Sequence, residues 1–110
     1  MRVRRRSSRL SLLGRVQLNL GGQHFEFPVA DISVTGVGIR LDVAVLGSKP
    51  SGEVGSCTIE SAQLAGPIEA YVSVMRIRRV GQQHLVGLRF ESISDEQLSL
   101  IHDYEKLANV

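Results

Sequence analysis

Apolar residues recur at every second position through much of this chain, and this period of two constrains the fold more than any other feature. The first two alternating segments contain Val16, Leu18, Leu20, Phe25, Phe27 and Val29. A period of two places alternate side chains on opposite faces of a β-strand. Gly21 and Gly22 lie between the two segments, and a Gly-Gly pair favours a two-residue turn. The pattern therefore predicts a β-hairpin with both apolar rows on one face.

The same reasoning extends to the rest of the chain. Further strands are predicted over residues 37–41, 54–60, 71–79 and 84–91, and the last two form a hairpin. Ser94 precedes Gln97 by three residues, the spacing of a capping box, and helical spacing follows. The helical apolar positions are Leu100, Ile101, Tyr104, Leu107 and Ala108. We expect a mainly β fold, a small six-stranded antiparallel β-barrel with a C-terminal α-helix.

Size and composition indicate one domain. The chain has 110 residues, of which 43% are hydrophobic, enough for a core without a metal or a disulfide. Its single cysteine, Cys57, cannot form an internal disulfide, so a reducing compartment is expected. No apolar run approaches the roughly 18 residues that a transmembrane helix needs, so we expect no membrane insertion and a cytoplasmic location.

The charges are unevenly distributed along the chain. Six arginines fall within the first 15 residues, whereas the first acidic residue is Glu26. They are Arg2, Arg4, Arg5, Arg6, Arg9 and Arg15. The sequence thus divides into a basic N-terminal arm, residues 1–14, and a mildly acidic body, residues 15–110. Guanidinium groups pair bidentately with phosphate or with the O6/N7 edge of guanine, so the arm favours an anionic partner.

Two short motifs stand in a fixed order. Arg5 and Arg9 are separated by three residues, and Asp31-x-Ser33-x-x-Gly36 begins after a gap of 21 residues, between the second and third predicted strands. This arrangement resembles the signature of the PilZ domain family, RxxxR followed by D/NxSxxG, with the second motif on a strand connection. The family's fold is a six-stranded antiparallel barrel with a C-terminal helix, so the resemblance covers almost the whole chain.

Smaller features also resemble the family. Gly38-Ile39 follows the second motif, and Gly87-x-x-Phe90 lies in the last strand, as in the family's usual pattern. Thr35 departs from it, because the family often has a second glycine there. The resemblance implies a receptor domain that binds cyclic di-GMP and catalyses no reaction. Such domains couple the bacterial second messenger to an attached domain or a partner protein, in motility, exopolysaccharide or biofilm control.

Each motif residue has a chemical role that suits such a ligand. The arginines supply charge-assisted hydrogen bonds to phosphate or guanine. Asp31 accepts from guanine N–H groups or orients an arginine, Ser33 adds a short hydroxyl, and Gly36 lets the ligand approach without a Cβ clash. The expected ligand-binding residues are Arg4, Arg5, Arg6, Arg9, Asp31, Ser33, Gly36 and Gly38.

The register of the first motif has an alternative, because Arg2 and Arg6 show the same spacing as Arg5 and Arg9. We choose the second pair, which ends closer to the first strand. Arg4 then immediately precedes the motif. In families of this type an arginine at that position resembles the form that holds two stacked ligands, so two cyclic di-GMP molecules per chain are expected.

Other functions remain open from the sequence alone. A basic arm on a small barrel also suits nucleic-acid binding, but the body is acidic and aromatic residues are only 5%, so we expect no DNA binding. A fold that has lost its ligand and serves protein contacts is a further alternative. Arg76, Arg78 and Arg79 either extend the basic face or protect a solvated hairpin edge.

Catalytic and metal sites are not predicted. His24, His84 and His102 lie on separate elements without cysteines or carboxylates at ligand spacing. The sequence contains neither a Gly-rich phosphate loop followed by Lys-Ser/Thr nor a nucleophile elbow. We therefore expect a binding protein with no cofactor beyond its ligand.

Overall fold

The computed structural model describes residues 9–42 and 53–108, which form seven strands and one helix. The strands are β1 (Leu10–Ser11), β2 (Arg15–Leu20), β3 (Gln23–Ser33), β4 (Gly36–Asp42), β5 (Val54–Glu60), β6 (Ile68–Val80) and β7 (Gln83–Ile93). The helix is α1 (Asp95–Ala108).

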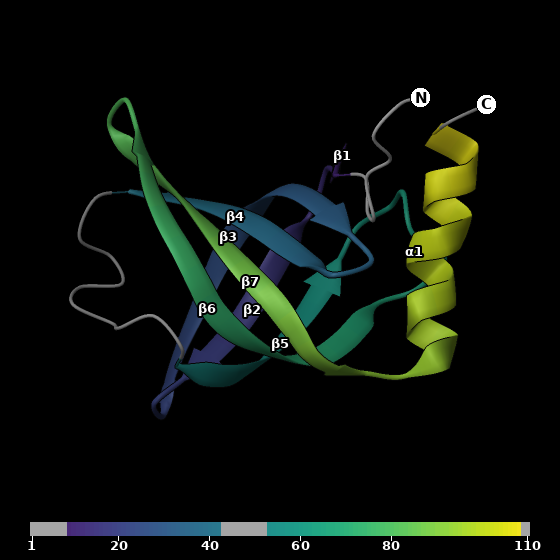
Figure 1. Cartoon of the computed structure of the whole chain (residues 1–110), viewed down its shortest axis with the longest axis horizontal. Coiled ribbons are helices and arrows are strands. Elements are labelled where there is room, and N and C mark those ends of the chain that lie inside the picture. The colour runs from purple at the N-terminus through teal and green to yellow at the C-terminus, as the bar shows by residue number, and fades with distance from the viewer. Residues whose placement is uncertain (1–8, 43–52, 109–110) are drawn as a thin grey trace, which may run out of the picture.

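Six of the strands form a closed antiparallel barrel. Their order is β3-β2-β5-β6-β7-β4, and β4 pairs again with β3 to complete the ring. The short strand β1 pairs with the end of β3. Figure 1 shows α1 beside one end of the barrel, while the tip of the β6–β7 hairpin extends away on the opposite side. The predicted six-stranded barrel with a C-terminal helix is confirmed.

The barrel core is built by the alternating rows that the sequence predicted. Its largest fully buried side chains include Leu18, Leu20, Ile32, Ile39, Ile59, Ile68, Leu88 and Ile101. Phe27 is buried and its ring stacks on that of the half-buried Phe25, with centroids 5.8 Å apart. Dispersion and the removal of apolar surface from water together stabilise this interior.

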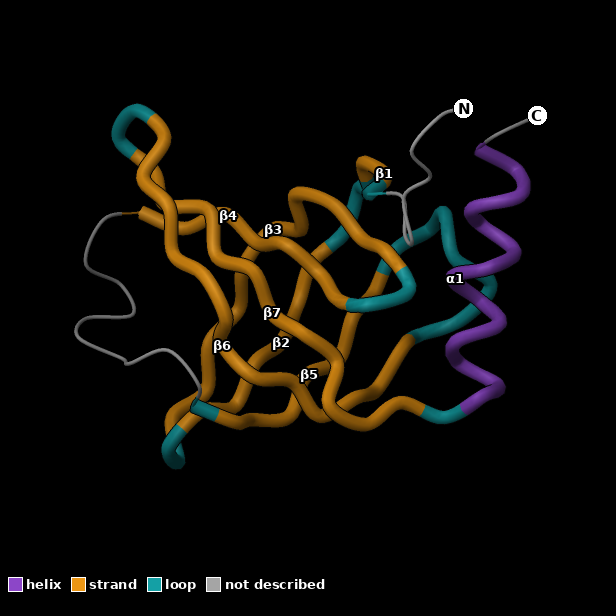
Figure 2. The backbone as a smooth tube through the Cα atoms, viewed as in Figure 1, coloured by secondary structure: helices purple, strands orange, loops and turns teal. Residues whose placement is uncertain are grey.

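The β2–β3 hairpin turns at Gly21 and Gly22, as predicted. Both have positive φ, 54° and 80°, a conformation that costs L side chains free energy and that type I′ hairpin turns require at both central residues. The β6–β7 hairpin turns at Gly81, where φ is 63°. The tube in Figure 2 shows both turns as short loops between long strands.

One expectation about the second motif was wrong. The segment from Asp31 to Gly36 is not a connection, because β3 continues through Ser33 and β4 begins at Gly36. Only Val34 and Thr35 form the turn. The register of β3 against β4 shifts between Val29 and Asp31, where Ala30 is an extra residue. This shift interrupts the alternation of apolar and polar residues, so the sequence pattern did not show that the strand continues.

The helix begins at the predicted cap but uses only half of the capping box. The backbone N–H of Gln97 donates to Ser94 Oγ at 3.2 Å, whereas Gln97 Oε1 accepts from the backbone N–H of Glu69 at 2.6 Å. The Gln97 side chain therefore ties α1 to β6 instead of closing the cap. No helix in residues 9–42 and 53–108 is long and apolar enough to cross a membrane.

The packing face of α1 is also narrower than predicted. Ile101 is fully buried, but Leu107 is 72% exposed because it lies in the last turn of the helix. Tyr104 contributes through its hydroxyl, which donates to the carbonyl oxygen of Ser11 at 2.6 Å. The helix thus holds the strand that precedes the barrel.

The buried thiol of Cys57 yields a prediction about accessibility. Cys57 is 3% exposed, and burial raises its pKa from 9.0 to about 12, against a smaller opposing effect of a backbone hydrogen bond with Ala70. The thiolate is the form that reacts with iodoacetamide. At pH 8, iodoacetamide should therefore label Cys57 in the native protein far more slowly than it labels the free thiol of glutathione. Labelling should rise in urea together with the loss of β-sheet circular dichroism.

The sign of the pH dependence follows from the same shift. A raised native pKa means that the folded state holds this proton more tightly, so the contribution of Cys57 to stability is complete below about pH 9 and falls as pH rises toward 12. A Cys57→Ala variant should lack that part of the alkaline loss. Rapid labelling of Cys57 in the absence of urea would contradict the packing of β5.

Candidate functional site

An arginine from the N-terminal arm contacts an aspartate of the second motif. Arg9 Nε and Nη2 both donate to Asp31 Oδ1, at 3.0 Å and 2.8 Å. Arg9 Nη1 lies 3.5 Å from Ser33 Oγ. Asp31 Oδ2 has no hydrogen-bond partner within the described ranges 9–42 and 53–108. The carboxylate therefore keeps one oxygen as an acceptor while the arginine holds the other.

A β-bulge determines which way Asp31 faces. Val29 points into the core and pairs with Ile39, and after the extra residue Ala30 it is Asp31 that pairs with Gly38. Without the extra residue, Asp31 would share the inward face of Val29. The bulge instead places the carboxylate on the outer surface of the barrel, over Gly38.

Gly38 is needed for this arrangement. A Cβ atom at position 38 would lie 2.5 Å from Asp31 Oδ1, closer than van der Waals contact allows. Only a glycine leaves the carboxylate free to lie flat against β4. The position of the Asp31 side chain therefore depends on Gly38, which lies two residues beyond the end of the second motif.

Ser33 and Gly36 fix the β3–β4 turn. Ser33 is buried, and its Oγ accepts from the backbone N–H of Thr35 at 3.2 Å and lies 2.9 Å from Thr35 Oγ1. The carbonyl oxygen of Thr35 accepts from the backbone N–H of Phe90 at 2.9 Å. A Cβ at Gly36 would lie 2.1 Å from the carbonyl oxygen of Leu88. Thr35 thus stabilises the turn through its side chain and its backbone.

These residues border a shallow pocket of about 460 Å³ on the outside of the barrel. Its volume falls in the range of about 300–1,000 Å³ that small-molecule sites occupy. The floor contains Gly36 and Gly38 of β4 and Gly87 of β7, and Arg9 and Asp31 form one side. The pocket lies where β3, β4 and β7 are neighbours, so it depends on the pairing that closes the barrel.

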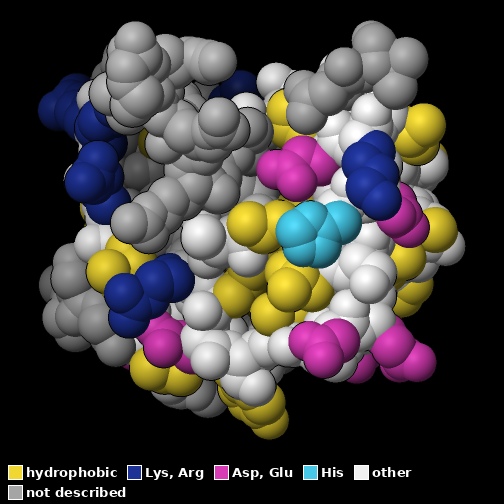
Figure 3. Space-filling model, turned by 45° about the vertical axis from the view of Figure 1, so that its right-hand side comes forward, with side chains coloured by type: hydrophobic (Ala, Val, Ile, Leu, Met, Phe, Trp, Pro, Cys, Tyr) yellow, Lys and Arg dark blue, Asp and Glu magenta, His cyan; other side chains and the backbone are white. Residues whose placement is uncertain are grey.

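Three further arginines border the same pocket, namely Arg76, Arg78 and Arg89. Arg89 pairs with Glu91 at 2.9 Å. A hydrogen bond from the Ser73 hydroxyl, together with those from Arg89, holds the pKa of Glu91 below its ordinary value. In Figure 3, Lys and Arg side chains gather mainly on the left of the face, and most Asp and Glu lie toward the right.

The structure brings together five of the residues that the sequence singled out. They are Arg9, Asp31, Ser33, Gly36 and Gly38. Arg4, Arg5 and Arg6 lie outside the described residues. Gly87 and Arg89 were not predicted as site residues, and Arg76 and Arg78 were left between two interpretations. Arg76 and Arg78 showed only as a basic cluster, which no motif distinguishes from a solvated hairpin, and Gly87 was noted only for its resemblance to the family pattern in the last strand.

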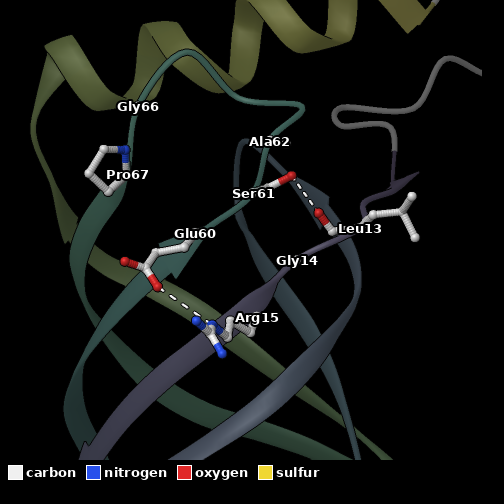
Figure 4. Close-up of a pocket in the computed structure, with 8 residues that line it drawn as sticks. All are labelled: Leu13, Gly14, Arg15, Glu60, Ser61, Ala62, Gly66 and Pro67. Atoms are coloured by element: carbon white, nitrogen blue, oxygen red, sulfur yellow. Dashed lines mark hydrogen bonds and ion pairs between the residues drawn. The ribbon is translucent and has the colours of Figure 1, made fainter.

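A second hollow, of about 530 Å³, lies beneath the helix end of the barrel. Figure 4 shows that its polar groups are already paired with one another. Arg15 Nε lies 3.7 Å from Glu60 Oε1, and the Ser61 hydroxyl donates to the carbonyl oxygen of Leu13 at 2.5 Å. Although this hollow is larger, it offers a ligand fewer free charges, so we take the glycine-floored pocket as the site.

Metal binding has no support in the part of the chain that the structure describes. No group of three or more His, Cys, Asp or Glu side chains there is placed to hold a metal ion.

Comparison with known proteins identifies relatives of this fold. The model of the PilZ domain family matches residues 3–106. No curated protein matches the sequence significantly. The structure of the Bacillus subtilis inhibitor of motility MotI/DgrA is similar, with a TM-score of 0.81 and 20% identity, over 97% of this chain and 52% of that one. The chain thus spans about half the length of the Bacillus protein.

Two structures of Escherichia coli YcgR are also similar. The PilZ domain of YcgR, described with c-di-GMP, has a TM-score of 0.74 and 21% identity, and the match covers 97% of this chain and 95% of that one. YcgR in complex with c-di-GMP has a TM-score of 0.76 and 20% identity, over 96% of this chain and 48% of that one. At these identities the likeness concerns the fold.

The glycines of the pocket generate a prediction about stability. Gly36→Ala should destabilise the protein by about 1–3 kcal/mol, because the added Cβ meets the backbone oxygen of Leu88 and the strands must move apart. Gly38→Ala should cost less, since the short Asp31 side chain can rotate away. Gly87→Ala is the control, because a Cβ there meets no atom closer than 4.0 Å.

Urea denaturation of the three variants measures this order. The midpoint should fall most for Gly36→Ala and least for Gly87→Ala. A Gly36→Ala midpoint equal to that of the unmodified protein would contradict the close approach of β4 and β7.

Proposed function

Because the chain belongs to the PilZ domain family, we propose that it is a receptor domain for cyclic di-GMP, with its binding site at the glycine-floored pocket. The observation that carries this proposal is the contact of Arg9 with Asp31 beside that pocket. It joins the last arginine of the first motif to the first residue of the second motif. The contact supports the register of Arg5 and Arg9 over that of Arg2 and Arg6.

The chemistry of the pocket suits a guanine dinucleotide. Cyclic di-GMP presents phosphate oxygens and guanine O6/N7 edges as acceptors, and guanine N–H groups as donors. Arg9 donates to the acceptors, and Asp31 Oδ2 accepts from a guanine N–H. The glycine floor lets a flat base approach the backbone closely. Ser33 acts through the turn, since its buried hydroxyl is engaged with Thr35.

The arm supplies the remaining part of the proposed site. Arg4, Arg5 and Arg6 lie outside the described residues. Arg5 is four positions before Arg9, so chain length alone keeps their Cα atoms within about 14 Å of each other. Pairing of β1 with the end of β3 fixes the chain next to Arg9, beside Asp31. We propose that Arg5 supplies a second guanidinium fork and that Arg4 and Arg6 add phosphate contacts.

The receptor passes its signal to another protein or domain in this proposal. The MotI/DgrA structure is that of an inhibitor of motility, and this chain spans about half of it. We propose the same kind of output here, control of motility or of exopolysaccharide and biofilm formation by a cytoplasmic protein. The domain holds the ligand, and the coupled partner performs the output.

The rival function of nucleic-acid binding finds less support. Single-strand binders stack bases on exposed aromatic rings. Phe27 is 6% exposed and Phe25 is partly buried against the core, so this pair packs into the barrel interior. A direct comparison of ligands separates the two functions.

The first test is calorimetry with cyclic di-GMP and with a short single-stranded oligonucleotide. The unmodified chain should bind the dinucleotide and not the oligonucleotide. Arg9→Ala or Asp31→Ala should weaken binding about tenfold to a hundredfold, because a hydrogen bond to a charged group contributes about 1.5–3 kcal/mol. Circular dichroism should show unchanged folding in both variants.

Arg15→Ala is the matched control for this test. Arg15 is also an exposed arginine near the arm, but it pairs with Glu26 at 3.1 Å and lines the other hollow. Its removal changes the net charge equally and should leave the affinity within about twofold, as a rim charge remote from the site would. Equal losses in Arg9→Ala and Arg15→Ala would reject the site, and the absence of cyclic di-GMP binding would reject the function.

The number of bound ligands is a separate prediction. A stacked pair of cyclic di-GMP molecules carries four phosphate charges and needs more cations than Arg5 and Arg9 supply, and Arg4 and Arg6 meet that need. Calorimetry at saturation should therefore give two ligands per chain, and Arg4→Leu should give one. A ratio near one for the unmodified chain would contradict both the pair and this register of the motif.

A further inference from the structure

A single row of paired residues crosses the floor of the pocket. Asp31 of β3 pairs with Gly38 of β4, Gly38 with Gly87 of β7, and Gly87 with Arg76 of β6. Side chains of paired residues lie on the same face of a sheet. The row therefore has a carboxylate at one end, a guanidinium at the other and two glycines between them.

A second β-bulge gives Arg76 its place in this row. Val74 is fully buried and pairs with Leu88, while Arg76 pairs with Gly87, so Met75 is an extra residue. With a strict period of two, Arg76 would lie on the same face of the sheet as Val74, which faces the barrel core. The shift after Met75 turns it outward, as the shift after Ala30 does for Asp31.

The geometry confirms that Arg76 faces the glycine floor. A Cβ built at Gly87 would lie 4.0 Å from the Cβ of Arg76, so the two positions point to the same side. Arg76 borders the pocket together with Asp31 and Gly38. Three inter-strand spacings separate the ends of the row, about 14 Å between Cα positions. This span accommodates a planar base between the two side chains.

The charge of Arg76 is not engaged elsewhere in the described part of the chain. Arg89, which borders the same pocket, is paired with Glu91, and Arg9 is paired with Asp31. Arg76 has no ion-pair or hydrogen-bond partner among residues 9–42 and 53–108. An exposed guanidinium that faces a side-chain-free floor is placed to meet an acceptor edge of a ligand.

We infer that Arg76 is a further ligand-binding residue, which forms the wall of the pocket opposite Arg9 and Asp31 and donates to an acceptor group of the cyclic dinucleotide across the floor of Gly38 and Gly87. The inference rests on the proposed function. It assigns to β6 a role that neither motif contains, and it gives the site donors on both sides of the bound base.

Calorimetry of the full chain with cyclic di-GMP tests this wall. Arg76→Ala should bind about tenfold more weakly, the loss that one charge-assisted contact represents. Arg76→Lys should recover part of the affinity, because it keeps the charge but not the bidentate fork. Arg79→Ala is the matched control: Arg79 is an exposed arginine of the same hairpin, but its Nε donates to the Gly81 carbonyl oxygen and it does not line the pocket.

Gly87→Val tests the floor independently of charge. Its Cβ meets no atom closer than 4.0 Å, so the variant should fold, yet its side chain occupies the space of the bound base and should abolish tight binding. Circular dichroism and the urea midpoint verify that it is folded.

The outcomes separate this inference from the function on which it rests. If the unmodified chain binds cyclic di-GMP and both Arg76→Ala and Gly87→Val bind it as tightly, Arg76 is not a ligand-binding residue, and the proposed receptor function is unaffected. Equal losses in Arg76→Ala and Arg79→Ala would also overturn the role of Arg76, because net charge alone would then explain the effect. If the unmodified chain does not bind cyclic di-GMP, both the proposed function and the role of Arg76 are rejected.

Discussion

The closure of the barrel by the pairing of β3 with β4 is the constraint on which the site depends. An open sheet would leave β3 at an edge, with unpaired backbone groups and without Gly38 beside Asp31. Closure puts β4 between β3 and β7, and the two-residue turn after Ser33 fixes the register of β3 against β4. The buried Ser33 hydroxyl and the bond from Phe90 to Thr35 hold that turn. The pocket therefore forms at the seam of the barrel.

Two extra residues shape the outer face of the barrel around the pocket. Ala30 and Met75 each interrupt the alternation of their strand, and each turns a charged residue from the core side to the outer side. Glycines on the intervening strands keep the surface between them bare. The same segments that bury Val29 and Val74 therefore present Asp31 and Arg76 to solvent. The core and the pocket therefore lie on opposite faces of one set of strands.

The sequence predicted those parts of the structure that follow a regular period or a motif. The apolar alternation gave the barrel strands, the Gly-Gly pair gave a turn, and Ser94 gave the start of the helix. The bulges were not predictable, because one extra residue within a strand leaves no mark in composition and reverses the facing of every later side chain. That is why the second motif was expected on a connection. The approach of Arg76 to the pocket depends on pairing between strands, which no local pattern encodes.

The hydrogen bond from Tyr104 to Ser11 gives the helix a mechanical connection to the arginine arm. Ser11 lies two residues from Arg9, whose guanidinium holds Asp31. This hydrogen bond anchors the chain two residues from Arg9, so the point at which the arm joins the barrel is tied to α1. A displacement of α1 would break this hydrogen bond and remove one of the contacts that support the segment next to Arg9. The C-terminal helix and the segment that enters the barrel are separated by most of the chain, yet this hydrogen bond joins them directly.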